Sequence, residues 1–203
     1  MHIILGVPYH DTIATAVLAL VILSWLVFAA VFLTHKRPSR RESVKKDRRS
    51  ALGIVLQAVA FLLIWAIQRP MFAPIVPMPP AVETVVGALT VALAFGSVWL
   101  VMAAVRALGR QWAYTARVIE GHQLITEGPY GRVRNPIYAG MLGMLVATGL
   151  ALTHWIGLLP ALVVFAIGTR IRVRSEEALL RDTFGAEFDR YAARVPAVLP
   201  RLF

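Results

Sequence analysis

The longest apolar run in the sequence, residues 12–34, constrains the fold more than any other feature. Its 23 residues include no charged side chain. A helix of that length measures about 35 Å, enough to cross the hydrocarbon core of a bilayer. Apolar residues make up 58% of the chain, above the roughly 45–50% of an average soluble domain. We therefore expect an integral membrane protein built from α-helices.

Four further apolar blocks follow, at residues 51–67, 81–105, 137–153 and 155–169. The last two would be only roughly 22–26 Å long as helices, less than the core of about 30 Å, and His154 alone separates them. We interpret them as a tight helical hairpin that either crosses the bilayer or dips into it. The prediction is an all-α membrane fold with about five transmembrane or hairpin helices.

Lysine and arginine are concentrated in three connections between these blocks. Residues 35–50 hold eight, residues 106–136 hold five and residues 170–203 hold seven, whereas residues 68–80 hold only Arg69. The positive-inside rule places the three cation-rich connections in the cytosol, with the N-terminus outside and the C-terminus inside. The net charge of +10 indicates contact with an anionic membrane surface rather than with nucleic acid, because the cations alternate with apolar blocks.

Some kinds of site are not expected in this chain. It has no cysteine, which excludes disulfides, thiolate metal sites and cysteine nucleophiles. His122 has no cluster of Asp, Glu or His at ligand spacing around it, so we expect no metal site. Trp112 and Tyr114 fit the aromatic belt at a membrane interface.

Turn-forming residues and arginines crowd the segment GPYGRVRNPIYAG, residues 128–140. Pro136 suits the first turn of the next helix and Asn135 its N-cap. The free N–H groups at that helix start, beside Arg132 and Arg134, would stabilise a carboxylate or phosphate. Capping and interfacial anchoring explain the same residues about equally well.

The second polar segment, residues 170–200, combines an apolar stripe with paired charges. Arg172 and Glu176 stand four residues apart, which allows either simple surface pairing or a functional pair at the edge of the membrane. The stripe predicts an amphipathic C-terminal helix lying against the protein or the membrane surface. Its members are Leu180, Phe184, Phe188 and Tyr191.

Both polar segments carry extended motifs, and these occur in a set order. The first reads H-x-L-I-T-x-G-P-Y-x-x-V-R-N-P-x-Y-x-G over residues 122–140, and the second S-E-E-x-L-L-x-x-x-F-G-x-E-F-x-x-Y-x-x-R-V-P-x-x-L-P over residues 175–200. Together they resemble the isoprenylcysteine carboxyl methyltransferase family, which is related to the phosphatidylethanolamine N-methyltransferases. The resemblance covers roughly residues 108–203. It implies a bacterial-type member in the inner membrane, with transmembrane helices in residues 1–107 and a cofactor-binding region in residues 108–203.

The resemblance implies an enzyme that uses S-adenosylmethionine to methylate a lipophilic acceptor at the cytosolic membrane face. Arg172 would lie near the acceptor, Glu176 would bind the cofactor, and Glu177 would complete the acidic pair. Arg134 suits the carboxylate of the cofactor. Tyr130, Tyr138 or Trp112 would stack on adenine or face the sulfonium. The cofactor-binding positions implied are His122, Gln123, Leu124, Ile125, Tyr130, Asn135, Pro136, Ile137 and Tyr138.

One residue departs from the family pattern. Relatives usually read Arg-His-Pro where this chain has Arg134-Asn135-Pro136, and an asparagine cannot titrate as a histidine does. The related NADPH-dependent membrane reductases share an Arg-x-Pro-x-Tyr-x-Gly stretch, and a non-catalytic membrane scaffold with the same fold is a further alternative. The acceptor stays open among a prenylated protein, a phospholipid amine, an isoprenoid and a small thiol.

Overall fold

The computed structural model describes residues 12–34, 43–46, 49–69, 79–113, 117–119 and 121–198. Within these ranges the fold is helical, as predicted. The 3₁₀ turns η2 (Gly109–Gln111) and η3 (Gly128–Gly131) lie in the connection between the third and fourth helices. The α-helices are α1 (Thr12–Thr34), α2 (Arg49–Ala66), α3 (Pro80–Leu108), α4 (Pro136–Leu152), α5 (Trp155–Phe184) and α6 (Ala186–Arg194).

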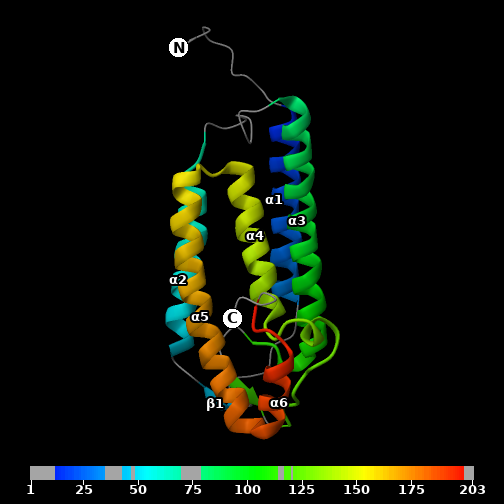
Figure 1. The fold of residues 1–203 in the computed structure, drawn as a ribbon, viewed down its shortest axis with the longest axis vertical. Helices are drawn as coiled ribbons and strands as arrows, with labels where there is room; N and C mark the ends of the chain where they lie inside the picture. The colour runs from blue at the N-terminus through cyan, green and yellow to red at the C-terminus, as the bar shows by residue number, and fades with distance from the viewer. Residues whose placement is uncertain are drawn as a thin grey trace.

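The long helices form two pairs with α4 between them (Figure 1). Helix α2 packs along α5, and α3 packs along both α4 and α1. Helix α6 lies at one end of the bundle, where α5 extends past the other helices (Figure 1). The connections that precede α2 and α4 reach this same end, which we call the polar end.

By length and composition, α1, α2, α3 with η2, and α5 qualify as membrane spans, whereas α4 is a shorter apolar helix. Large apolar side chains such as Leu26, Leu62 and Leu89 are exposed on the outside of the bundle, where lipid rather than water would cover them. These observations confirm the prediction of an integral membrane fold.

The expected tight hairpin of α4 and α5 is present, but the bounds expected for the apolar part of its second helix, residues 155–169, cover only half of α5. Helix α4 has 17 residues, about 26 Å, but α5 continues past residue 169 to Phe184 and is about 45 Å long. No helix breaker occurs in residues 170–184; the helix ends where Gly185 adopts a φ of +51°, a conformation that glycine readily provides. The single C-terminal helix predicted for residues 180–191 is accordingly divided between α5 and α6.

A short antiparallel ribbon at the polar end was not predicted. Strand β1 (Ser43–Lys46) pairs with β2 (Arg117–Ile119), and β2 lies against α5. The pairing joins two connections that are far apart in the sequence, and neither has the alternating apolar pattern that marks a strand.

Glycines allow the closest helix contacts in the bundle. A Cβ atom added at Gly168 of α5 would lie 2.9 Å from the backbone oxygen of Gly53 in α2, and one added at Gly53 would lie 2.7 Å from the oxygen of Gly168. Likewise, a Cβ at Gly140 of α4 would lie 2.5 Å from Val101 of α3. These approaches set the positions of α4 and α5, which carry the central residues of the site described next.

At the end opposite the polar end, side chains bond backbone carbonyls and close the bundle. Arg69 donates through Nη2 to the carbonyl oxygens of Leu150 and Ala151, and Thr153 Oγ1 donates to Ile64 O over 2.7 Å. The carbonyls at the end of α4 are thereby satisfied. Arg69 therefore has a structural role at this end of the bundle.

Candidate active site

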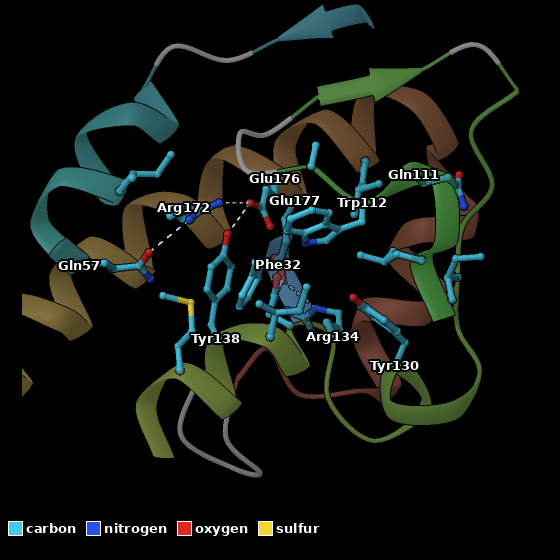
Figure 2. A pocket seen from close by; sticks show the side chains of 18 of the residues that line it. Phe32, Gln57, Gln111, Trp112, Tyr130, Arg134, Tyr138, Arg172, Glu176 and Glu177 are labelled. Carbon is cyan, nitrogen blue, oxygen red and sulfur yellow. Dashed lines mark hydrogen bonds and ion pairs between the residues drawn. The ribbon is translucent and has the colours of Figure 1, made fainter. Parts of the chain in front are cut away.

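A cavity of about 720 Å³ opens at the polar end of the bundle. Residues of α1, α2, α4, α5 and α6, together with the connection between α3 and α4, form its wall. Figure 2 shows side chains from these elements pointing toward one another around it. The volume lies within the roughly 300–1,000 Å³ typical of small-molecule sites.

A chain of hydrogen bonds and an ion pair crosses one wall of the cavity (Figure 2). Tyr138 of α4 donates its hydroxyl to Glu176 of α5. The guanidinium of Arg172 reaches Glu176 Oε1 through Nη2 and Gln57 Oε1 through Nη1, both over 3.3 Å. Gln57 Nε2 then donates to Thr169 Oγ1 over 2.9 Å. The network joins three helices at the depth where α5 leaves the apolar part of the bundle.

Arg172 is buried although it carries a permanent charge. Its side chain is 10% exposed, and its guanidinium carbon lies 4.9 Å from the centre of the Tyr138 ring. Charges in such places need partners, and Gln57, Glu176 and the ring of Tyr138 all face it. The absence of a Cβ at Gly53 makes room for the stem of Arg172. The side chain is thereby fixed at the cavity wall.

Glu176 differs from Arg172 in its access to the cavity. Its side chain keeps 27% exposure while it contacts Arg172 and Tyr138. A carboxylate accepts up to about four hydrogen bonds, so Glu176 has capacity for a cationic or hydroxyl-bearing ligand. The sequence left open whether Arg172 and Glu176 form a simple surface pair or a functional pair. In the structure this pair lies in the cavity wall, where a ligand can contact Glu176.

Arg134 and Glu177 form a second ion pair, which holds the C-terminal segment. Arg134 Nε lies 2.8 Å from Glu177 Oε1, and Nη1 donates to Ala192 O over 2.9 Å and to Val195 O. We expected this guanidinium to receive a ligand carboxylate. In the structure it instead binds the end of α6, because the carbonyls there lack helical partners.

Asn135 is the N-cap residue of α4, as predicted, but its side chain makes no capping bond. Its Nδ2 donates to Ala197 O over 3.0 Å and lies 3.4 Å from Glu177 Oε1. The N–H groups of Arg134 and Asn135 also bond the C-terminal segment, at Pro196 O and Ala197 O. Fewer backbone N–H groups than expected are therefore free to bind an anion near the start of α4.

His122 lies in the connection between α3 and α4, which lines the cavity. Its Nδ1 atom is buried and has no hydrogen-bond partner among the described residues, and its ring centre is 6.1 Å from that of Phe184. Burial lowers the pKa of His122, so the imidazole is neutral near pH 7 and keeps one nitrogen as an acceptor. An unpaired buried polar atom beside a cavity is a reasonable contact for a ligand.

Aromatic side chains close the cavity at the loop and at α6. Tyr191 of α6 donates its hydroxyl to Tyr130 O over 2.7 Å, and burial raises the pKa of Tyr191 to about 12. Trp112 is 2% exposed and its ring centre lies 5.4 Å from that of Phe32 in α1. The interfacial position expected for Trp112 was therefore wrong; Tyr114 lies outside the described residues.

The structure brings the predicted site residues together. The cavity wall includes all of them except Pro136, which is buried in the first turn of α4. The residues of the prediction that line it are His122, Gln123, Leu124, Ile125, Tyr130, Arg134, Asn135, Ile137, Tyr138, Arg172, Glu176 and Glu177.

Helices α1 and α2 form a large part of the cavity that sequence reasoning missed. They contribute mainly apolar and aromatic side chains, and Trp25 of α1 meets Phe61 of α2 with ring centres 5.2 Å apart. Only Gln57 had a usable signal, as an isolated amide in the otherwise apolar core of α2. Apolar wall residues have no such signal, because in a membrane helix they look like residues that face lipid.

Comparison with known proteins identifies the superfamily. A model of the phospholipid methyltransferase family matches residues 82–187, a range that includes α4, α5 and nearly all of α3. The chain belongs to this family. The predicted resemblance to the isoprenylcysteine carboxyl methyltransferases is also confirmed, because several curated relatives carry that name.

Curated relatives of two kinds match the chain. The protein-S-isoprenylcysteine O-methyltransferase B of Arabidopsis thaliana is 34% identical over 94 residues, 45% of this chain and 48% of that protein. The Nickel-cobalt-cadmium resistance protein NccN of Alcaligenes xylosoxydans xylosoxydans is 40% identical over 114 residues, 54% of this chain and 50% of that protein. The matching region spans about half the length of these curated relatives.

Proposed function

We propose that this protein is an S-adenosylmethionine-dependent methyltransferase that acts on a lipophilic acceptor at the cytosolic face of a membrane. The observation that carries the proposal is the composition of the cavity. One part of its lining holds the polar network around Arg172 and Glu176, whereas the side chains from α1 and, apart from Gln57, from α2 are apolar. A cavity of this kind suits a polar methyl donor beside an acceptor with an apolar tail.

The residues present fit the donor. Glu176 faces the cavity with spare acceptor capacity and suits an ammonium group or a ribose diol. The unpaired His122 Nδ1 is available to a donor group of the ligand, and Tyr130, Tyr138 and Trp112 provide aromatic faces for adenine or for a cation. When bound, S-adenosylmethionine supplies a methyl group on a positively charged sulfur, so the protein needs no metal for activation.

The residues around the acceptor would act by positioning and by excluding water. Arg172 is fixed at the wall and would orient a carboxylate, which needs no proton removed before it is methylated. The aromatic side chains of α1 and α2 would hold the apolar tail, and the acceptor would enter from the bilayer between helices. A carboxylate on an isoprenoid-bearing molecule fits this arrangement and agrees with the names of the plant relatives.

The proposed location is the bacterial inner membrane, with the polar end in the cytosol. The support is the positive-inside rule, applied to the cations that gather at one end of the bundle. S-adenosylmethionine would then reach the cavity from the cytosol, and the acceptor from the lipid.

Calorimetric titration of the detergent-purified protein with S-adenosylhomocysteine tests donor binding. We expect binding by the wild type and a loss of about tenfold or more in Glu176→Ala, since a bond to a charged group is removed. Glu187→Ala, which alters an exposed carboxylate of α6, is the matched control and should bind as the wild type does.

The same titration separates the alternatives. No binding by the wild type, or unchanged affinity in Glu176→Ala, would refute the proposal. Affinity for NADPH instead would favour the reductase. Absence of binding for both ligands would favour a scaffold without catalytic activity.

The acceptor class is tested by incubating membranes with radiolabelled S-adenosylmethionine. Label in base-labile methyl esters is expected, because Arg172 suits a carboxylate. Label in phospholipid amines or in volatile thioethers would redirect the acceptor to those classes and would contradict the carboxylate assignment.

A further inference from the structure

Gln57 is a buried polar residue of the cavity wall to which the proposed reaction assigns no role. Its residue surface is 2% exposed, and it lies in α2 among apolar neighbours. An amide buried in such a place is costly unless it is hydrogen-bonded. Both ends of this amide are bonded, to Arg172 on one side and to Thr169 on the other.

The chemistry of the partners fixes the orientation of the amide. A guanidinium has only donors, so Gln57 must present Oε1 to Arg172 Nη1. Its Nε2 group is then left to donate to Thr169 Oγ1, which is the arrangement observed at 2.9 Å. Thr169 and Arg172 both belong to α5, so Gln57 connects one helix turn of α5 to α2 at the height of the cavity.

Gln57 holds Arg172 without neutralising it. The carboxylate of Glu176 lies 3.3 Å from the guanidinium, whereas Gln57 contacts it through a neutral amide. Where the ammonium of a bound methyl donor draws on Glu176, the neutral amide of Gln57 still orients Arg172 and leaves its positive charge for another anion. A glutamate in place of Gln57 would have nearly the same shape but would cancel that charge.

We propose that Gln57 is a positioning residue that aims the guanidinium of Arg172 at the anionic group of the acceptor while preserving its charge. The inference rests on the proposed methyltransferase function and adds to it a residue of α2, outside both sequence motifs. It assigns the recognition of an acceptor carboxylate to three residues on two helices, Gln57, Thr169 and Arg172.

The test compares binding of N-acetyl-S-farnesylcysteine, which has a free carboxylate, with binding of its methyl ester, which has none. Dissociation constants are measured on purified protein saturated with S-adenosylhomocysteine. The wild type should prefer the carboxylate by about tenfold or more, the range of a hydrogen-bonded charge. Gln57→Leu and Gln57→Glu should each lower this preference to about twofold or less.

Gln57→Glu separates positioning from packing. Because glutamate has the shape of glutamine, a purely structural role predicts that this variant keeps the preference, and that result would overturn the inference. Gln68→Leu makes the same chemical change as Gln57→Leu at an exposed site beyond the other end of α2. This control should keep the preference for the carboxylate over the ester. Affinity for S-adenosylhomocysteine should be unchanged in Gln68→Leu.

Two outcomes distinguish failure of this inference from failure of the proposed function. A wild type that binds S-adenosylhomocysteine but does not discriminate between acid and ester would overturn the inference alone. A wild type that does not bind S-adenosylhomocysteine would overturn the methyltransferase function, and the role of Gln57 with it.

Discussion

Arg134 and Arg172 illustrate, at the scale of single residues, how two arginines of one cavity take different roles. Arg134 contacts Glu177 and the carbonyls of Ala192 and Val195, all within or beside the C-terminal segment. Arg172 contacts the side chains of Gln57 and Glu176 and lines the cavity. Arg134 therefore holds the C-terminal segment in place, whereas Arg172 lies in the cavity wall, where a ligand would contact it.

Replacing Arg134 with methionine should destabilise the protein. The pair it forms with Glu177 is mostly buried, with side chains 12% and 15% exposed. Removing one partner leaves the other carboxylate buried and unpaired, at a cost of about 3 kcal/mol. The melting temperature in detergent should fall by roughly 5–10 °C.

Two further variants make this prediction specific. Arg134→Met combined with Glu177→Met should recover part of the loss, because no unpaired charge remains. Arg181→Met removes a pair with Asp189 whose side chains are 51% and 56% exposed and should change the free energy of unfolding by less than about 1 kcal/mol. An equal loss of stability in Arg134→Met and Arg181→Met would contradict the role of Arg134 in holding the C-terminal segment.

At the scale of helices, α5 connects the membrane-spanning bundle to the site. Its first part packs against α2 inside the bundle, and its last turns carry Arg172, Glu176 and Glu177. The contact of Gly53 with Gly168 fixes the height of α5 against α2. The position of Arg172 therefore depends on the packing of glycines as well as on its own hydrogen bonds.

Gly53→Ala should disturb both stability and the site. The added methyl would clash with the Cγ of Arg172 and lie 2.7 Å from Gly168 O, and overpacking of this kind costs about 1–3 kcal/mol. The melting temperature should fall, and transfer of label from S-adenosylmethionine should decrease as Arg172 shifts.

Gly96→Ala provides the matched control for this helix contact. Gly96 lies in α3, and a Cβ there would meet no heavy atom within 4 Å. The substitution should be neutral or slightly stabilising, because alanine favours a helix over glycine. A similar decrease in melting temperature and in label transfer in Gly53→Ala and Gly96→Ala would show that the loss in Gly53→Ala is not due to the contact of α2 with α5.

At the scale of the whole molecule, charge and chemistry lie at the same end. The connections rich in lysine and arginine lead to the end that carries α6 and β1 (Figure 1), and the cavity opens at this same end. The opposite end, where the turn between α4 and α5 meets the end of α2, has Arg69 bonded to backbone carbonyls. This asymmetry predicts one orientation in the membrane.

The orientation can be measured with single cysteines, since the chain has none of its own. Gln68→Cys and Arg190→Cys place a thiol at exposed positions near opposite ends. In intact cells, a membrane-impermeant maleimide should label position 68, and position 190 should be labelled only after the membrane is opened. The reverse pattern would place the cavity outside and contradict the proposed use of cytosolic S-adenosylmethionine.

Much of the site could be predicted because its residues lie in two continuous segments. His122, Tyr138 and Glu176 each belong to a motif that can be read locally, and the cavity unites them. The bonding of Arg134 and Asn135 could not be predicted, because their partners are backbone carbonyls of the C-terminal segment. A carbonyl is present in every residue, so no side-chain pattern marks which one will be used.

By itself, the sequence determined the membrane location, the approximate helix positions, the charge asymmetry and the family resemblance. These follow from apolar length, cation counts and motifs, all of which are local or additive along the chain. The tertiary structure decided that Gln57 meets Arg172, that α1 and α2 supply apolar lining to the cavity, and that Trp112 is buried in the cavity wall. Each of these depends on how closely helices approach, and that is set by packing between residues far apart in the sequence.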